Sequence, residues 1–122
     1  MSKHFRFEDL KIWQKAIDTG SNLFALSLKL DSMKYFRFAE QLRAAGLSIS
    51  NNIAEGSGSY TNADFARFLK YSRQSIFECV NILIVFEKQG IISNEALTKL
   101  EIELEELSKM IFGFIKSLNN SN

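Results

Sequence analysis

The chain has 122 residues, enough for one domain that buries roughly two-thirds of the surface of its unfolded form, and too few for a second core. A formal net charge of +1 gives no overall attraction to nucleic acid, so any electrostatic partner must bind a local patch. The lack of proline favours long helices, and the single cysteine, Cys79, excludes an internal disulfide framework and a zinc site with several cysteines. We therefore expect residues 1–122 to form a single helical domain.

The first residues and the longest apolar runs indicate where the protein is located. Residues 1–10 are charged and contain no apolar signal segment, and no run approaches the roughly 20 apolar residues that a membrane-spanning helix needs. We expect a soluble, cytoplasmic protein that does not contact a membrane.

A short arm, residues 1–7, precedes the first expected helix. This helix should begin near Glu8, because Glu8 and Asp9 place negative charge at its N-terminus. Helical spacing predicts an inner face that comprises Leu10, Trp13, Ala16, Ile17, Gly20, Phe24 and Ser27. A second apolar stripe lies beside it and contains Ile12, Leu23, Leu26 and Leu30.

Capping residues set the expected bounds of the next three helices. Asp31 and Ser32 are candidate N-caps for a helix at about 34–56, and Thr61 with Asp64 predicts the start of a helix at about 62–89. Ser93 should cap the fourth helix, and a frayed tail should begin at Asn119.

Each of these helices has an apolar stripe. The second carries Leu42, Ala45, Ile49, Asn52, Ile53 and Gly56, and the third carries Phe65, Phe68, Leu69, Ser72, Ile76, Cys79, Leu83 and Phe86. The fourth has the most regular pattern, with Leu97, Leu100, Leu104, Leu107, Ile111, Phe114 and Leu118. Four long helices with short connections predict an all-α fold, an antiparallel up-down-up-down four-helix bundle.

Small polar residues run beside the buried stripe of the second helix. This polar seam comprises Gln41, Ser48, Asn52 and Glu55, and a helical hairpin that turns near residue 59 adds Ser75 and Glu78 from the third helix. The same alignment places Arg67 where it could neutralise Glu55. The seam either fixes the register of the helices through hydrogen bonds or binds a small polar ligand, and we favour the first interpretation.

The sequence offers no convincing catalytic or metal site. His4 is the only histidine and lies on the arm, the Glu-x-x-His signature of di-metal bundles is absent, and the glycine-rich turn at 56–60 lacks the lysine of a phosphate-binding loop. We therefore expect no enzymatic activity, no metal and no cofactor.

Two outward-facing features suggest binding instead. Apolar residues predicted opposite the core, which favour a homo-oligomer interface, are Phe36, Leu47, Phe77 and Ile84. Basic residues on the second and third helices are Arg37, Arg43, Arg67, Lys70 and Arg73. They are either ordinary solvated charges or, when repeated around an oligomer, a band that binds phosphates.

Several motifs together resemble a known family. They are F-x-x-L-x-x-W-x-x-A at residues 7–16, QLRAA at 41–45, SISNNIAEG at 48–56, F-x-R-F-L at 65–69 and S-x-x-E at 75–78. The set resembles the bacterial four-helix-bundle family encoded in intervening sequences of 23S ribosomal RNA genes, whose fold is similar to that of accessory variability proteins of diversity-generating retroelements. The resemblance implies a ring of subunits, with a pentamer as the expected form, and a link to nucleic acid.

The sequence departs from this family pattern at two places. The pattern has a proline and an acidic residue before the second helix, where this chain has Asp31-Ser32-Met33-Lys34-Tyr35 and no proline. The pattern also has an arginine after the glycine of the NIAEG run, where this chain has a neutral segment at 57–59. We expect a non-enzymatic, ring-forming bundle whose basic surface on the second and third helices binds structured RNA or DNA. The alternative is a protein-interaction scaffold that recruits partner helices and binds no nucleic acid.

Overall fold

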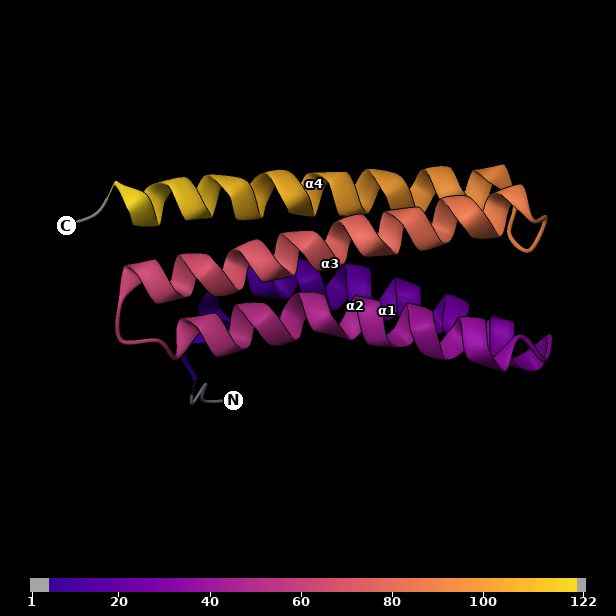
Figure 1. Cartoon of the computed structure of the whole chain (residues 1–122), viewed down its shortest axis with the longest axis horizontal. Coiled ribbons are helices and arrows are strands. Elements are labelled where there is room, and N and C mark those ends of the chain that lie inside the picture. Colours follow the sequence, from indigo (N-terminus) through magenta and orange to yellow (C-terminus); the bar gives the residue numbers. More distant parts are fainter. Residues whose placement is uncertain (1–4, 121–122) are drawn as a thin grey trace.

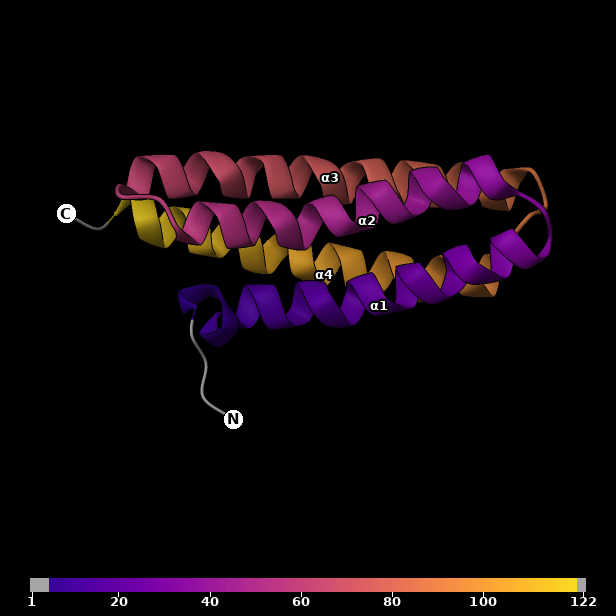
Figure 2. The same ribbon diagram turned by 90° about the horizontal axis from the view of Figure 1, so that it is seen from below.

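The computed structural model describes residues 5–120, which form four long α-helices after one turn of 3₁₀ helix (Figure 1). The elements are η1 (Arg6–Asp9), α1 (Lys11–Ser32), α2 (Phe36–Ser57), α3 (Asn62–Lys88) and α4 (Asn94–Asn119). Successive helices run in opposite directions and lie side by side, and α4 also contacts α1 (Figures 1 and 2). The predicted all-α, up-down-up-down four-helix bundle is confirmed.

The start of the chain differs from the expected arm. Residues 1–4, including His4, lie outside the described residues, but Phe7 packs on Trp13 with ring centroids 5.1 Å apart, and the Arg6 guanidinium lies 5.1 Å from the centre of the Phe65 ring. Glu8 accepts a hydrogen bond from the backbone N–H of Phe5 and so closes a 3₁₀ turn rather than opening α1. Residues 5–7 are therefore part of the packed bundle, and α1 begins only at Lys11.

The inner face of α1 was predicted only in part. Ala16 and Ser27 are buried as expected, but Ile17 and Phe24 are 39% and 52% exposed. The stripe that was expected to be secondary supplies three of the six buried residues, Ile12, Leu23 and Leu30. The buried residues of α1 are Ile12, Ala16, Thr19, Leu23, Ser27 and Leu30. Two adjacent apolar stripes have the same period, so periodicity alone could not decide which of them faces the core.

The turn between α1 and α2 also differs from the prediction. Asp31 and Ser32 belong to the last turn of α1, and α2 begins after Tyr35 with no side-chain cap. Lys34 takes a left-handed conformation (φ 69°), the role that glycine usually has after a helix. The caps of the other helices are confirmed, since Thr61 Oγ1 accepts from the Asp64 N–H and Ser93 Oγ from the Ala96 N–H.

The apolar stripes predicted for α2, α3 and α4 form the core. They are buried except for Asn52, Phe68 and Phe114, which are partly exposed. At the C-terminus, Asn119 is the last residue of α4 rather than part of a frayed tail, and residues 121–122 lie outside the described range. None of the described helices is long and apolar enough to cross a membrane.

Candidate nucleic-acid interface

Only three residues of the predicted polar seam, Ser48, Asn52 and Ser75, form a hydrogen-bonded cluster where α2 meets α3. The Ser48 and Ser75 hydroxyls share a hydrogen bond of 2.8 Å between the two helices. The Asn52 amide donates to the Ser48 carbonyl at 2.8 Å and to the Ser48 hydroxyl at 3.1 Å, so it supports the cluster from within α2. The cluster joins α2 to α3 through side chains that satisfy one another.

The remaining seam residues do not take part in this cluster. Gln41, Glu55 and Glu78 are all exposed. The predicted pairing of Glu55 with Arg67 is wrong, because Arg67 instead lies 3.6 Å from Asp64, one turn earlier on its own helix. Ser72, which the sequence placed on the inward face of α3 but not in the polar seam, donates its buried hydroxyl to the Ile49 carbonyl across the α2/α3 boundary at 2.8 Å. Its position in the apolar stripe of α3 was the available signal.

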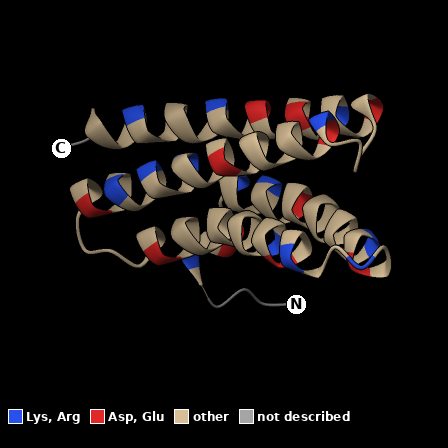
Figure 3. Cartoon of the chain, turned by 45° about the vertical axis from the view of Figure 1, so that its right-hand side comes forward, with Lys and Arg blue, Asp and Glu red and all other residues tan. Residues whose placement is uncertain are grey.

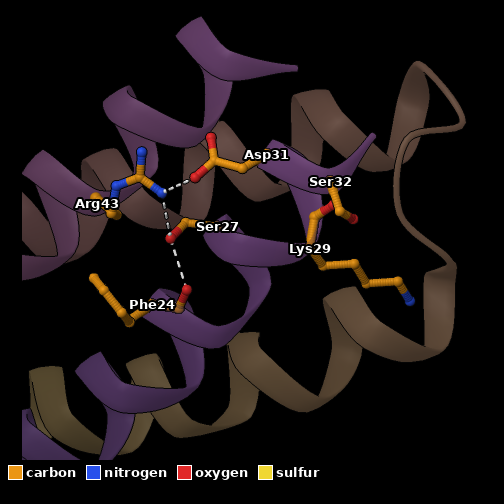
Figure 4. Close-up of polar contacts among 6 residues, drawn as sticks. All are labelled: Phe24, Ser27, Lys29, Asp31, Ser32 and Arg43. Carbon is orange, nitrogen blue, oxygen red and sulfur yellow. Dashed lines mark hydrogen bonds and ion pairs between the residues drawn. The ribbon is translucent and has the colours of Figure 1, made fainter. Parts of the chain in front are cut away.

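The predicted basic surface on α2 and α3 is not one patch. Arg43 points toward α1, where its Nη1 donates to Ser27 Oγ at 3.0 Å and to Asp31 Oδ2 at 2.7 Å (Figure 4). The Ser27 hydroxyl in turn donates to the Phe24 carbonyl at 2.6 Å. Arg43 is therefore engaged in a bond between α1 and α2, whereas Arg37 is exposed in the first turn of α2.

Arg67 lies against aromatic rings of its own helix. Its guanidinium is 4.7 Å from the centre of the Phe68 ring and 5.9 Å from that of Tyr71. Hydrogen bonding with Tyr71, with smaller effects of the Tyr71 and Asp64 charges, raises the pKa of Arg67 above its ordinary value, so the side chain stays cationic at any physiological pH. The nearby Asp64 carboxylate nevertheless offsets part of its attraction for phosphate.

Arg73 points the other way, toward α4. Its Nε–H donates to Ser108 Oγ at 3.2 Å, and its guanidinium lies 5.5 Å from the centre of the Phe77 ring and 5.1 Å from that of Phe112. On α4, Lys116 follows Phe112 by one helical turn, and its ammonium lies 5.8 Å from the centre of the Phe112 ring. A shallow hollow at the surface of α3 is lined by Arg73, Phe77 and Lys70.

These residues form one surface across two helices, which we call the α3/α4 cluster and define as Lys70, Arg73, Phe77, Phe112 and Lys116. The N-terminal half of α3 lies beside the C-terminal half of α4, and Figure 3 shows basic residues along both of these halves, with acidic residues concentrated in the N-terminal half of α4. Sequence reasoning found Lys70, Arg73 and Phe77 but not Phe112 and Lys116, which are one helical turn apart on α4.

Three of the four outward apolar residues line two separate grooves, and Phe36 lines neither of them. Leu47 lines a groove of about 510 Å³ between α1 and α2, together with Ile17 and Phe24. Phe77 and Ile84 line another of about 570 Å³ between α3 and α4. Phe36, Leu47 and Phe77 are each at least 60% exposed, whereas Ile84 is partly buried against the core.

The possible metal ligands and the Cys79 thiol are the remaining groups to place. Within residues 5–120, no three histidine, cysteine, aspartate or glutamate side chains gather closely enough to hold a metal ion. Burial, and to a lesser extent the charge of Glu78, raises the pKa of the Cys79 thiol to about 12, which keeps it protonated and a poor nucleophile at neutral pH.

The family described as "23S rRNA-intervening sequence protein" matches residues 8–113 of this sequence. The chain belongs to that family. Among solved structures, the chain is similar to a protein of unknown function from the S23 ribosomal protein family of Bacteroides thetaiotaomicron, at 23% identity and a TM-score of 0.82, over 86% of this chain and 98% of that one. This likeness supports the four-helix fold of the family member described here. No curated protein matches the sequence.

Proposed function

We propose that this family member is a non-enzymatic cytoplasmic protein that binds RNA or DNA through phosphate contacts on its α3/α4 cluster. The observation that carries the proposal is the convergence of Lys70, Arg73 and Lys116 on one surface beside two exposed rings. The surface differs from the one expected on α2 and α3, because Arg43 is bonded to Asp31 and Arg67 lies beside Asp64.

We further propose that the protein is a homo-oligomer, with the pentamer implied by the family resemblance as the expected form. The apolar groove between α1 and α2 and the exposed Phe36 at the start of α2 support this, and neither overlaps the α3/α4 cluster. A head-to-tail contact between two different surfaces closes into a ring when the rotation per subunit allows it. Each ring would then carry several copies of the cluster, and binding at several copies strengthens a weak contact.

The test is the salt dependence of RNA binding by the full-length protein. In fluorescence anisotropy with a labelled RNA, the double variant Lys70→Gln, Lys116→Gln should bind more weakly, and its slope of log K against log salt should be shallower by about 0.7 to 0.9 per lost phosphate contact. The matched control is Lys11→Gln, Lys29→Gln, which removes the same charge from exposed positions on α1. Equal affinity and slope for the two double variants would overturn the proposal.

The size of the protein in solution tests the oligomer separately. Light scattering at micromolar concentration should give a mass several times the 13.9 kDa of the chain. A monomeric mass under these conditions would exclude the ring. The nucleic-acid proposal would then concern the single α3/α4 cluster of each monomer.

A protein-interaction scaffold is the second candidate function. The observation that favours it is the groove between α1 and α2, whose rim contains the exposed Ile17, Phe24 and Leu47. A protein partner lost on Leu47→Asp but retained after nuclease treatment would support the scaffold, and RNA binding that is independent of the α3/α4 cluster would favour neither function as stated.

A further inference from the structure

The α3/α4 cluster contains two aromatic rings that the bundle does not bury. Phe77 is 61% exposed and Phe112 is 49% exposed, although a buried phenylalanine contributes far more to stability. They come from different helices, and the Arg73 guanidinium lies within 5.5 Å of both ring centres. Part of each ring surface is therefore open to a flat ligand.

The guanidinium of Arg73 is held in place rather than free in solvent. Its Nε–H donates to Ser108 Oγ at 3.2 Å, and its central carbon, Cζ, lies over the rings of Phe77 and Phe112. Because a fixed planar cation loses little freedom when a ligand stacks on it, Arg73 is suited to contact a nucleobase or a phosphate. Two further cations lie nearby, because Lys70 lines the same hollow as Arg73 and the Lys116 ammonium lies 5.8 Å from the centre of the Phe112 ring.

The charges of the groove limit the length of the ligand. The groove between α3 and α4 begins at Arg73 and continues past Glu101 and Glu105, and Glu105 is itself 3.4 Å from Lys109. Carboxylates repel a phosphate backbone, so a bound strand is expected to stay on the basic half of the groove. The footprint is then a few nucleotides rather than a long track.

We propose that the α3/α4 cluster binds single-stranded nucleic acid, with bases stacked on Phe77 and Phe112 and phosphates held by Lys70, Arg73 and Lys116. This rests on the proposed function and specifies its ligand. Bases of a duplex are already stacked on one another, so a duplex meets only the cations, whereas an unpaired strand meets the rings as well. With about three phosphate contacts, the slope of log K against log salt is about −2 for a single strand.

The experiment compares four labelled 12-nucleotide ligands by fluorescence anisotropy with the full-length protein. They are a single-stranded RNA, the DNA of the same sequence, a DNA duplex, and an abasic DNA strand that keeps the phosphates but has no bases. The wild type should bind both single strands more tightly than the duplex and the abasic strand. A preference for either the RNA or the DNA single strand supports the proposal and shows whether the site prefers ribose or deoxyribose.

The decisive variants remove a ring but keep an apolar side chain. Phe77→Leu and Phe112→Leu should each weaken binding of the single strands by about 5- to 100-fold, the usual effect of losing one base–aromatic stack, and leave the abasic strand unaffected. Phe36→Leu is the matched control, because Phe36 is 60% exposed but lies on α2 away from the cluster. All three side chains are exposed, so the substitutions leave the core intact.

The outcomes separate this inference from the function on which it rests. If the phenylalanine variants bind like the wild type but Lys70→Gln, Lys116→Gln binds more weakly, the stacking proposal is wrong and phosphate binding stands. If the abasic strand binds as tightly as the RNA, stacking is likewise excluded. If no ligand binds, both proposals fall.

Discussion

Arg43 on α2 lies 2.7 Å from the carboxylate of Asp31 on α1, and the two side chains are only 26% and 30% exposed. The same nitrogen of Arg43 also donates to Ser27 at 3.0 Å. An arginine held between two acceptors in a partly buried site contributes to the packing of α1 against α2 and has little remaining attraction for a phosphate. This contact explains why a cation predicted for nucleic-acid binding serves the fold.

The energy of this pair can be measured with a double-mutant cycle. Arg43→Met, Asp31→Asn and the double variant should give a coupling of about 1 to 2 kcal/mol in urea unfolding, because the pair is partly shielded from water and its geometry is close. The control pair is Lys109 and Glu105, which are 77% and 72% exposed at 3.4 Å and should couple by about 0.5 kcal/mol or less. Similar coupling energies for the two pairs would show that shielding is unimportant here.

The sequence predicted α2, α3 and α4 well because each carries one apolar stripe at helical spacing. It failed in part on α1, where the stripe containing Ile17 and the stripe containing Leu23 have equal periodicity. Aligning α2 and α3 as a hairpin placed Ser75 on the polar seam but put Ser48 level with Ser72, whereas Ser48 bonds to Ser75 and Ser72 bonds to the Ile49 carbonyl. Which helix contacts each face of α1 depends on the crossing of all four helices, which the pattern of one helix does not contain.

The basic residues of α3 show a second limit of prediction from the sequence. The sequence places three cations at steps of three residues, Arg67, Lys70 and Arg73, as if they formed one row. Three residues rotate around the helix axis by about 300°, so each successive side chain is displaced by about 60° from the one before it. Arg67 therefore packs on Phe68 and Tyr71, whereas Arg73 reaches Ser108 on α4. The partners Phe112 and Lys116 could not be assigned to Arg73 without knowing the relative height of α3 and α4.

Gly56, near the end of α2, should not tolerate a side chain. A Cβ at this position would lie 2.8 Å from both Phe65 Cδ1 and Phe68 Cβ, closer than carbon atoms pack without displacement. Gly56→Ala should therefore destabilise the bundle by about 1 to 3 kcal/mol, the usual cost of overpacking. The measurement is urea unfolding at matched protein concentration, since the stability of an oligomer depends on concentration.

Gly113 provides the control for that substitution. It lies inside α4, and a Cβ there would have no atom outside its own helix backbone within 4 Å. Gly113→Ala should stabilise the protein by about 0.5 to 1 kcal/mol, because alanine favours the helix more than glycine does. A destabilised Gly113→Ala, or a Gly56→Ala as stable as the wild type, would contradict the packing described here.

Cys79 makes the stability of the fold sensitive to alkaline pH. Burial, with a smaller effect of Glu78, raises the pKa of its thiol from 9.0 to about 12. Because the folded pKa lies above the unfolded one, the thiol's contribution to stability is fully present below pH 9 and is lost as the pH rises from 9 to 12, where the unfolded chain ionises first. At pH 10 the loss should be on the order of 1 kcal/mol.

The variant Cys79→Ala lacks this ionisation and isolates it from the lysines and tyrosines that titrate in the same range. The difference in unfolding free energy between the wild type and Cys79→Ala should therefore fall by about 1 kcal/mol between pH 8 and pH 10, because only the wild type has a thiol that ionises on unfolding. Urea unfolding of both proteins in a reducing buffer at the two pH values measures the change. A difference that stays constant would mean that the Cys79 thiol ionises as readily in the folded bundle as in the unfolded chain, which is incompatible with its complete burial between the helices.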